Sequence, residues 1–142
     1  MKQAFRLVSA TLLIAFLCAQ ETRPYSYTFD KGNGVCVYTA TTFEEAWSAV
    51  NRTLLQDKFR VITTDKQGGV LVAERRPYAA YNYRLSLFIE NIDQGIRISS
   101  SIEPAIKAEG LAGLGQNTGH QKKEHEKLEK KFYDAVASLL YK

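Results

Sequence analysis

The stretch YNYRLSLFIENIDQGIRISSSI, residues 81–102, decides the fold of this chain. Apolar side chains recur at every second position from 81 to 89 and again at 96, 98 and 102, on either side of a turn at 91–95. Successive side chains of a strand point to opposite faces, so this alternation gives each strand one apolar and one polar face. The stretch therefore predicts two antiparallel strands of a sheet that is covered on one side.

Shorter β-rich runs precede this pair of strands. Residues 60–64 and 70–74 are rich in β-branched side chains, and the turn residues DKQGG separate them. They predict a second hairpin, which ends near Pro77 because proline cannot donate to a central ladder. Further upstream, residues 35–39 predict another strand, and the alternating residues 25–29 are either its hairpin partner or an extended lead-in.

Two helices are expected beside these strands. Thr42 and Glu45 have the spacing of a capping box, in which the hydroxyl accepts a backbone N–H and the glutamate reaches back to the cap residue. Apolar residues at helical spacing follow as far as Phe59. A final helix, at about residues 121–141, carries apolar side chains at 128, 132, 135 or 136, and 139 on one face.

Together these elements predict an α+β fold with the order β-α-β-β-β-β-α. The strands cluster between the helices instead of alternating with them, which is typical of an antiparallel sheet and not of a doubly wound one. We expect a sheet of four to five strands with both helices on one face. In this division, residues 20–34 are an N-terminal lead-in and residues 35–142 form a single domain.

Residues 1–19 have the pattern of a secretory signal peptide. Lys2 and Arg6 come first, and an uncharged apolar run then extends to Ala19. This run is shorter than the roughly 20 apolar residues that span a bilayer. A cationic start, then an apolar run and then a small residue is the order that the export machinery recognises. We therefore expect an extracytoplasmic protein, either in the bacterial periplasm or anchored to a membrane.

Two processing routes are open at the end of this run. Cleavage after Ala19 would remove Cys18, whereas lipidation of Cys18, as in bacterial lipoproteins, would anchor the protein, with each buried methylene contributing about 0.8 kcal/mol. Membrane attachment is expected only on the second route. Either route leaves Cys36 as the single free thiol, and its place between Val35 and Val37 predicts a core residue.

A helix-to-hairpin pattern runs through residues 39–76. It is carried by Ala46, Trp47, Val50, Leu54, Phe59, Arg60, Val61, Asp65, Gly69 and residues 70–74. The pattern resembles that of small bacterial envelope lipoproteins and of the repeated domain of the outer-membrane assembly lipoprotein C. The resemblance implies an envelope location and a binding or scaffolding role on a helix-covered sheet, and it transfers no catalytic residue.

Charge and motif spacing argue against several function classes. The formal net charge is +4, of which Lys2 and Arg6 supply two, so the remaining excess does not indicate a nucleic-acid partner. His120 and His125 are five residues apart, not the four that place two rings on one helix face, so no metal site is expected. The glycines at 113–119 precede no P-loop Lys-Ser/Thr pair, and no cofactor is expected.

One surface patch is expected to bind a partner. It combines the basic and aromatic side chains Arg75, Arg76, Tyr78 and Arg84 beside one strand. Guanidinium groups next to aromatic rings can hold anionic groups or sugars. Tyr83, in contrast, is expected in the core because it shares the register of the apolar positions 85 and 87.

No arrangement typical of an enzyme occurs in the sequence. Glu44 and Glu45 are explained by the helix cap, and neither a nucleophile elbow nor an HExxH motif is present. We therefore expect a non-catalytic exported cell-envelope module that binds or scaffolds a protein, peptidoglycan or lipid partner. The alternative is a small hydrolase or ligand carrier with a pocket under the glycine-rich loop at 108–119, which requires titratable groups that converge in a cavity.

Overall fold

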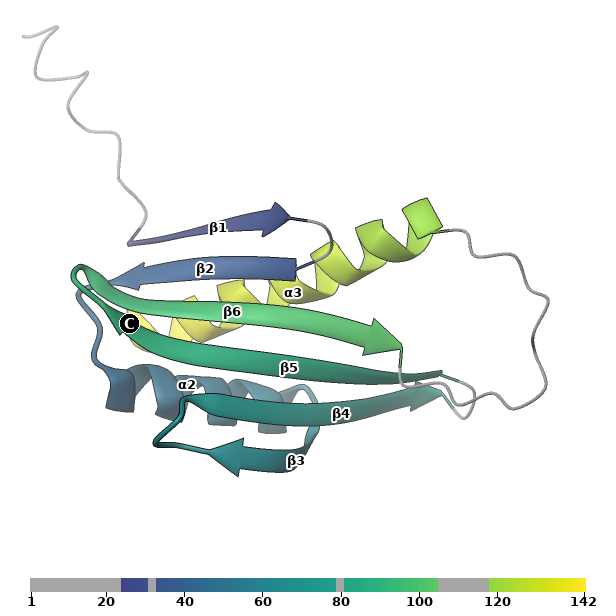
Figure 1. Ribbon diagram of the computed structural model, residues 1–142, viewed down its shortest axis with the longest axis horizontal. Helices are drawn as coiled ribbons and strands as arrows, with labels where there is room; N and C mark the ends of the chain where they lie inside the picture. The colour runs from purple at the N-terminus through teal and green to yellow at the C-terminus, as the bar shows by residue number, and fades with distance from the viewer. Residues whose placement is uncertain (1–23, 31–32, 79–80, 105–117) are drawn as a thin grey trace, which may run out of the picture.

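The computed structural model describes residues 24–30, 33–78, 81–104 and 118–142, and it has an α+β architecture (Figure 1). In chain order, the elements within these ranges are β1 (Tyr25–Asp30), β2 (Asn33–Thr39), α2 (Phe43–Gln56), β3 (Arg60–Asp65), β4 (Val70–Tyr78), β5 (Tyr81–Ile92), β6 (Gly95–Pro104) and α3 (Thr118–Leu140). The strands form one antiparallel sheet, and Figure 1 shows both helices on the same side of it.

The strand order across the sheet is β1-β2-β6-β5-β4-β3. Strands β3 to β6 follow one another as a meander, whereas β2 pairs with β6, with Cys36 opposite Ile98. This long-range pairing joins the N-terminal hairpin to the meander. Both helices of the described ranges cross the same side, so no described residue forms a helix on the opposite side of the sheet (Figure 1).

The expected fold class and antiparallel sheet are confirmed, but the expected strand number and order are wrong. The described residues form six strands in the order β-β-α-β-β-β-β-α. The difference is β1, which pairs along its whole length with β2, from Tyr25 opposite Tyr38 to Asp30 opposite Asn33. The rings of Tyr25, Tyr27 and Phe29 pack against the core, and this packing explains why the segment is a strand and not a lead-in.

The alternation of residues 81–102 produces the predicted buried face. Leu85 lies opposite Ile102 and Ile89 opposite Ile98, and all four side chains are buried. The hairpin between β3 and β4 is fixed by Gly69, whose φ of 69° suits a glycine. A Cβ at that position would collide with the carbonyl oxygen of Ile89, so the turn also requires glycine for close packing.

Helix α2 begins with the predicted capping box. The backbone N–H of Glu45 donates to Thr42 Oγ1 at 3.3 Å, and the N–H of Thr42 donates to Glu45 Oε2 at 2.9 Å. The helix buries Ala46, Val50 and Leu54 against the sheet. Capping and burial of one apolar stripe together account for where this helix begins and how it faces.

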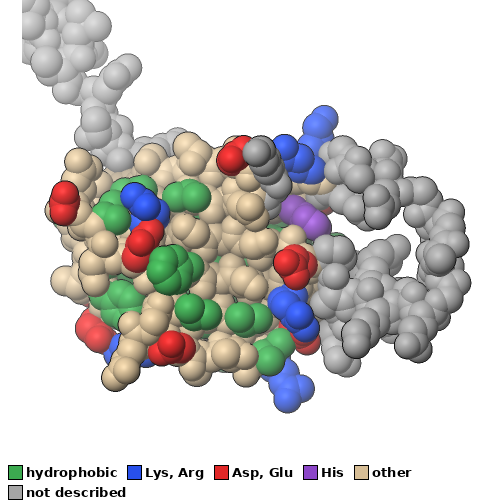
Figure 2. Space-filling model, in the orientation of Figure 1, with side chains coloured by type: hydrophobic (Ala, Val, Ile, Leu, Met, Phe, Trp, Pro, Cys, Tyr) green, Lys and Arg blue, Asp and Glu red, His purple; other side chains and the backbone are tan. Residues whose placement is uncertain are grey.

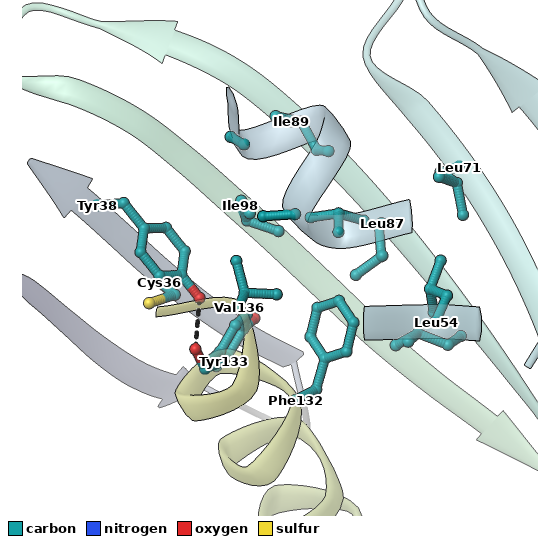
Figure 3. Packing of buried hydrophobic residues seen from close by; sticks show 14 of the residues in the cluster. Cys36, Tyr38, Leu54, Leu71, Leu87, Ile89, Ile98, Phe132, Tyr133 and Val136 are labelled. Carbon is teal, nitrogen blue, oxygen red and sulfur yellow. Dashed lines mark hydrogen bonds between the residues drawn. The ribbon is translucent and has the colours of Figure 1, made fainter. Parts of the chain in front are cut away.

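Helix α3 completes the core from the other end of the chain. It inserts Phe132, Tyr133 and Val136 among the buried side chains of the sheet and of α2 (Figure 3). The Tyr38 hydroxyl donates to the Tyr133 carbonyl oxygen at 2.9 Å, and Figure 3 shows this bond between β2 and α3. Within the part of the chain that the structure describes, neither helix has the length and apolar character required to cross a membrane.

Candidate functional site

The two described arginines of the expected patch lie on opposite faces of the sheet. Arg84 is on the face without helices, and its Nη2 atom is 2.9 Å from Glu74 Oε1 in an ion pair. Arg75 is on the helix side, where its guanidinium lies 5.8 Å from the centre of the Phe59 ring. Glu74 and Arg75 are consecutive residues of β4, and the pleat sends their side chains to opposite faces.

Other expected site residues lie outside the described parts of the chain. Arg76 and Tyr78 belong to the backbone of β4, but their side chains are not among those that the structure describes. Cys18 and the rest of the expected signal peptide, residues 1–19, precede the described ranges, and residues 108–117 of the glycine-rich loop fall between two of them. The structure therefore brings Arg75 together with neither Arg84 nor any other described basic residue of the patch.

Arg75 instead lines a cleft between α3 and the sheet. The cleft has a volume of about 180 Å³ and is lined by Phe59, Arg75, Tyr83, Leu85, Ile102, Glu124 and Leu128. Five of these residues are apolar or aromatic, and Arg75 forms no ion pair with any described residue. A concave apolar surface with a few polar groups is the usual form of a small-molecule site.

Tyr83 lies at one side of this cleft, against α3. Its ring meets the His125 ring edge-on, with 6.0 Å between the ring centres and 90° between their planes. Burial lowers the pKa of His125, which favours the neutral ring at neutral pH. Tyr83 thus packs toward the core side of the sheet, as its register predicts, and not on the surface beside Arg84.

A smaller hollow of about 20 Å³ adjoins the cleft, and this volume is roughly the room that one water molecule needs. The hollow shares five lining residues with the cleft, namely Phe59, Arg75, Leu85, Ile102 and Leu128. Its other lining residues are Asp57, Glu129, Lys131 and Phe132. Among these, Glu129 is a fully buried carboxyl group, which is rare unless the group is paired.

Glu129 is held by hydrogen bonds at only one of its two oxygens. Its Oε1 atom accepts from Ser100 Oγ at 2.6 Å and from the backbone N–H of Gly34 at 3.3 Å. Ser100 Oγ also forms a hydrogen bond with the Tyr133 hydroxyl. The Oε2 atom has no hydrogen-bond partner among the described residues. Such an unpartnered buried oxygen destabilises a protein by roughly 1–3 kcal/mol unless something binds to it.

Burial raises the pKa of Glu129 to about 7, although the hydrogen bonds from Ser100 and Gly34 act in the opposite direction. The carboxyl group is therefore present in both protonated and ionised forms near neutral pH. Ser100 and Glu129 are 3% and 0% exposed, so an acyl or glycosyl substrate cannot reach this pair from bulk solvent. The arrangement is suited to binding a small polar group and not to attack on a large substrate.

The expectation that Cys36 is a core residue is confirmed. Its side chain is fully buried, and burial raises the pKa of its thiol to about 12. A thiol in this state is a poor nucleophile and a poor metal ligand. No cluster of three His, Cys, Asp or Glu side chains that could hold a metal ion occurs in the described ranges.

The sequence pattern missed Glu129 because the neighbouring residues of the helix are strongly charged. However, Glu129 lies three and four residues before Phe132 and Tyr133, so it shares their helix face. Ser100 likewise occupies an inward position of β6, between Ile98 and Ile102. Two polar residues at core positions were therefore visible in the sequence, but their proximity depends on the tertiary fold.

Comparison with known proteins adds no relative: no protein-family model matches this chain, and no curated protein matches it.

Proposed function

We propose that this protein is a non-catalytic, exported module of the bacterial cell envelope that binds a partner protein through the helix-free face of its sheet. The observation that carries the proposal is Phe88, a large aromatic side chain of the central strand β5 that is 44% exposed on this face. Aromatic side chains exposed in the middle of a surface are enriched at protein interfaces.

Phe88 belongs to a row that crosses four strands. Val35 of β2 lies opposite Ser99 of β6, Ser99 lies opposite Phe88, and Phe88 lies opposite Val70 of β4. All four side chains therefore face the same side of the sheet. Figure 2 shows this face, on which green apolar side chains lie within a largely tan surface, with a few Lys/Arg and Asp/Glu side chains between and around them. The row gives a partner a flat, largely uncharged surface.

Ion pairs flank this row on both sides along the strand direction. Arg84 pairs with Glu74 at 2.9 Å on one side, and Arg97 pairs with Glu90 at 3.1 Å on the other. Their charges are neutralised within the protein, which lowers the cost of placing them at the rim of an interface. This face, which we call the outer face, thus has an apolar centre and a paired polar rim.

The location in the envelope rests on the sequence of residues 1–19 and on the resemblance of residues 39–76 to envelope lipoproteins. Peptidoglycan and lipid are the other partners that such a location allows. A protein is favoured because the described residues of the outer face combine an exposed aromatic ring with a charge-neutral rim and contain no cluster of unpaired cations for an anionic surface.

Hydrolysis has less support than binding. The cluster of titratable and hydroxyl groups next to the cleft consists of Glu129, Ser100 and Tyr133, and all three are buried. A hydrolase needs such groups in contact with its substrate.

The proposal is tested with a photo-crosslinking amino acid placed at Phe88 in cells that produce the protein natively. The matched control is the same amino acid at Leu55, which is 71% exposed on α2 in the helix layer. We expect one discrete protein adduct from position 88 and none from position 55, and we expect Val72→Asp on the outer face to abolish it. Adducts to lipid or glycan, or equal adducts from both positions, would contradict the proposal.

A further inference from the structure

The cleft between α3 and the sheet has the size of one aromatic ring. Its volume is about 180 Å³, and an apolar protein cavity of about 150 Å³ is known to hold benzene. Phe59, Tyr83, Leu85, Ile102 and Leu128 supply apolar surface on several sides. Two of these are aromatic rings, which pack favourably against a further ring in edge-to-face or offset geometry.

The smaller hollow adds a position for one polar group. Its volume of about 20 Å³ suits a single oxygen-sized group, and Glu129, which has one unpartnered oxygen, lines it. Because burial raises the pKa of Glu129 to about 7, the group bound there meets a hydrogen-bond donor in one protonation state and an acceptor in the other. A hydroxyl both donates and accepts, whereas an ammonium only donates and an ether only accepts.

The charges around the cleft and the hollow favour a neutral ligand. Arg75 and Lys131 are the cationic lining residues, and Asp57, Glu124 and Glu129 are the acidic ones. Lys127 offsets Glu124 through an ion pair at 3.5 Å. With both signs present, neither an anion nor a cation gains a clear advantage, and a charged head group would lose its hydration on entering the hollow.

From these observations we propose that the cleft binds a neutral phenol, with its ring against Phe59, Tyr83 and Leu128 and its hydroxyl in the hollow beside Glu129. This site lies on the helix side of the sheet, opposite the outer face. It therefore does not depend on the proposed partner protein, and either proposal can fail alone.

The test uses the full chain and four probes of similar size: phenol, benzene, benzoate and benzylamine. Binding is followed by NMR chemical shifts of the side chains of Tyr83 and Leu128. We expect phenol to bind about tenfold more tightly than benzene, the factor that one net hydrogen bond to a buried group supplies. We expect benzoate and benzylamine to bind more weakly than phenol.

Two substitutions on one helix locate the site. Leu128→Trp fills the cleft and should abolish binding of phenol and benzene alike. Leu139→Trp is the matched control, because Leu139 is also half-buried on α3 but lies against α2 instead of the cleft. It should leave phenol binding unchanged. Glu129→Leu should remove the preference for phenol over benzene, and if that variant does not fold, the Trp pair still locates the site.

Several results would overturn the proposal. Equal affinity for phenol and benzene would show that Glu129 does not bind the hydroxyl group. A lack of phenol binding up to its solubility limit would show that the cleft is not a binding site for a phenol. Tighter binding of benzoate or benzylamine would show that the ligand is charged. Loss of binding in Leu139→Trp as complete as in Leu128→Trp would place the site elsewhere.

Discussion

The Ser100 hydroxyl on β6 donates a 2.6 Å hydrogen bond to Glu129 Oε1 on α3, in the middle of an apolar core. Both residues occupy inward positions of their elements, so the bond joins the last helix to the centre of the sheet. A buried hydrogen bond offsets only part of the cost of removing a carboxyl group from water. Glu129 therefore responds to pH in a way that surface carboxylates do not.

The contribution of Glu129 to stability should decrease as pH rises from acidic to neutral values. The pKa of Glu129 is about 7 in the folded protein and has an ordinary value of 4.5, so the folded state keeps a proton that the unfolded state releases between these values. Because of Glu129, the free energy of unfolding is about 3 kcal/mol larger at a pH below 4.5, the unfolded pKa, than at a pH above about 7, the folded pKa.

Urea unfolding of the wild type and of Glu129→Gln, from about pH 5 to about pH 8, measures this contribution. Gln is neutral throughout this range, so the variant should lose the part of the pH dependence that Glu129 supplies. Parallel pH profiles for the two proteins would show that Glu129 is ionised in the folded state.

Gly34→Ala should destabilise the protein through the same cluster. An added Cβ would lie 2.7 Å from Tyr133 Oη and 2.8 Å from Ser100 Oγ, and both atoms are held by hydrogen bonds in the core. Overpacking of this kind costs about 1–3 kcal/mol. The control is Gly68→Ala in an exposed turn, where the Asp65 side chain can move into solvent, and its cost should be about 0.5 kcal/mol or less. Equal unfolding midpoints for the two variants would contradict this packing.

The alternation of side chains between the two faces of a strand accounts for most of what the sequence predicts about the sheet. Within the described side chains, the alternation in residues 81–102 correctly identifies the core-facing positions of β5 and β6, including the partly buried Tyr83. The same alternation places Arg75 on the face of β4 that carries the buried Leu71 and Ala73. It places Arg84 on the opposite face from the buried residues of β5. The expected patch joined these two arginines because they are close in the sequence, but the pleat sends their side chains to opposite faces of the sheet. The cleft that Arg75 lines forms only where α3 packs against the sheet.

The register of β1 and the Ser100–Glu129 pair were less accessible to prediction. Local pattern allowed residues 25–29 to be a strand or a lead-in, because the choice depends on whether β2 and α3 offer a surface for their aromatic rings. Ser100 and Glu129 are distant in the sequence and join elements that only the complete fold brings together. No periodicity within one element encodes such a contact.

Adjacent leucines of α2 provide a matched test of the packing. Leu54 is fully buried and Leu55 is 71% exposed. We expect Leu54→Ala to lower the free energy of unfolding by about 2–5 kcal/mol, since it removes core surface and leaves a cavity. Leu55→Ala should change it by about 0.5 kcal/mol or less. Chemical denaturation of both variants measures the difference, and similar losses would mean that α2 is rotated about its axis.

The Cys36 thiol should be unreactive while the protein is folded. Its side chain is fully buried, and its pKa of about 12 leaves very little thiolate at neutral pH. Iodoacetamide should therefore modify Cys36 only after urea is added. Peptide mass spectrometry follows this residue separately from Cys18. Alkylation in the absence of urea, as fast as in the unfolded chain, would contradict a buried thiol.

Lipidation of Cys18 is the prediction that decides whether the protein carries a lipid anchor. The residue lies next to the end of the apolar run of the expected signal sequence, where a lipoprotein carries its acyl chains, and such chains would hold the domain at a membrane without a spanning helix. Protein isolated from native membranes should carry acyl mass that Cys18→Ser lacks. Cys36→Ser should retain this mass, since Cys36 is buried. A wild-type chain that begins at Gln20 would instead show cleavage after Ala19, and the mature protein would then have no lipid anchor at this position.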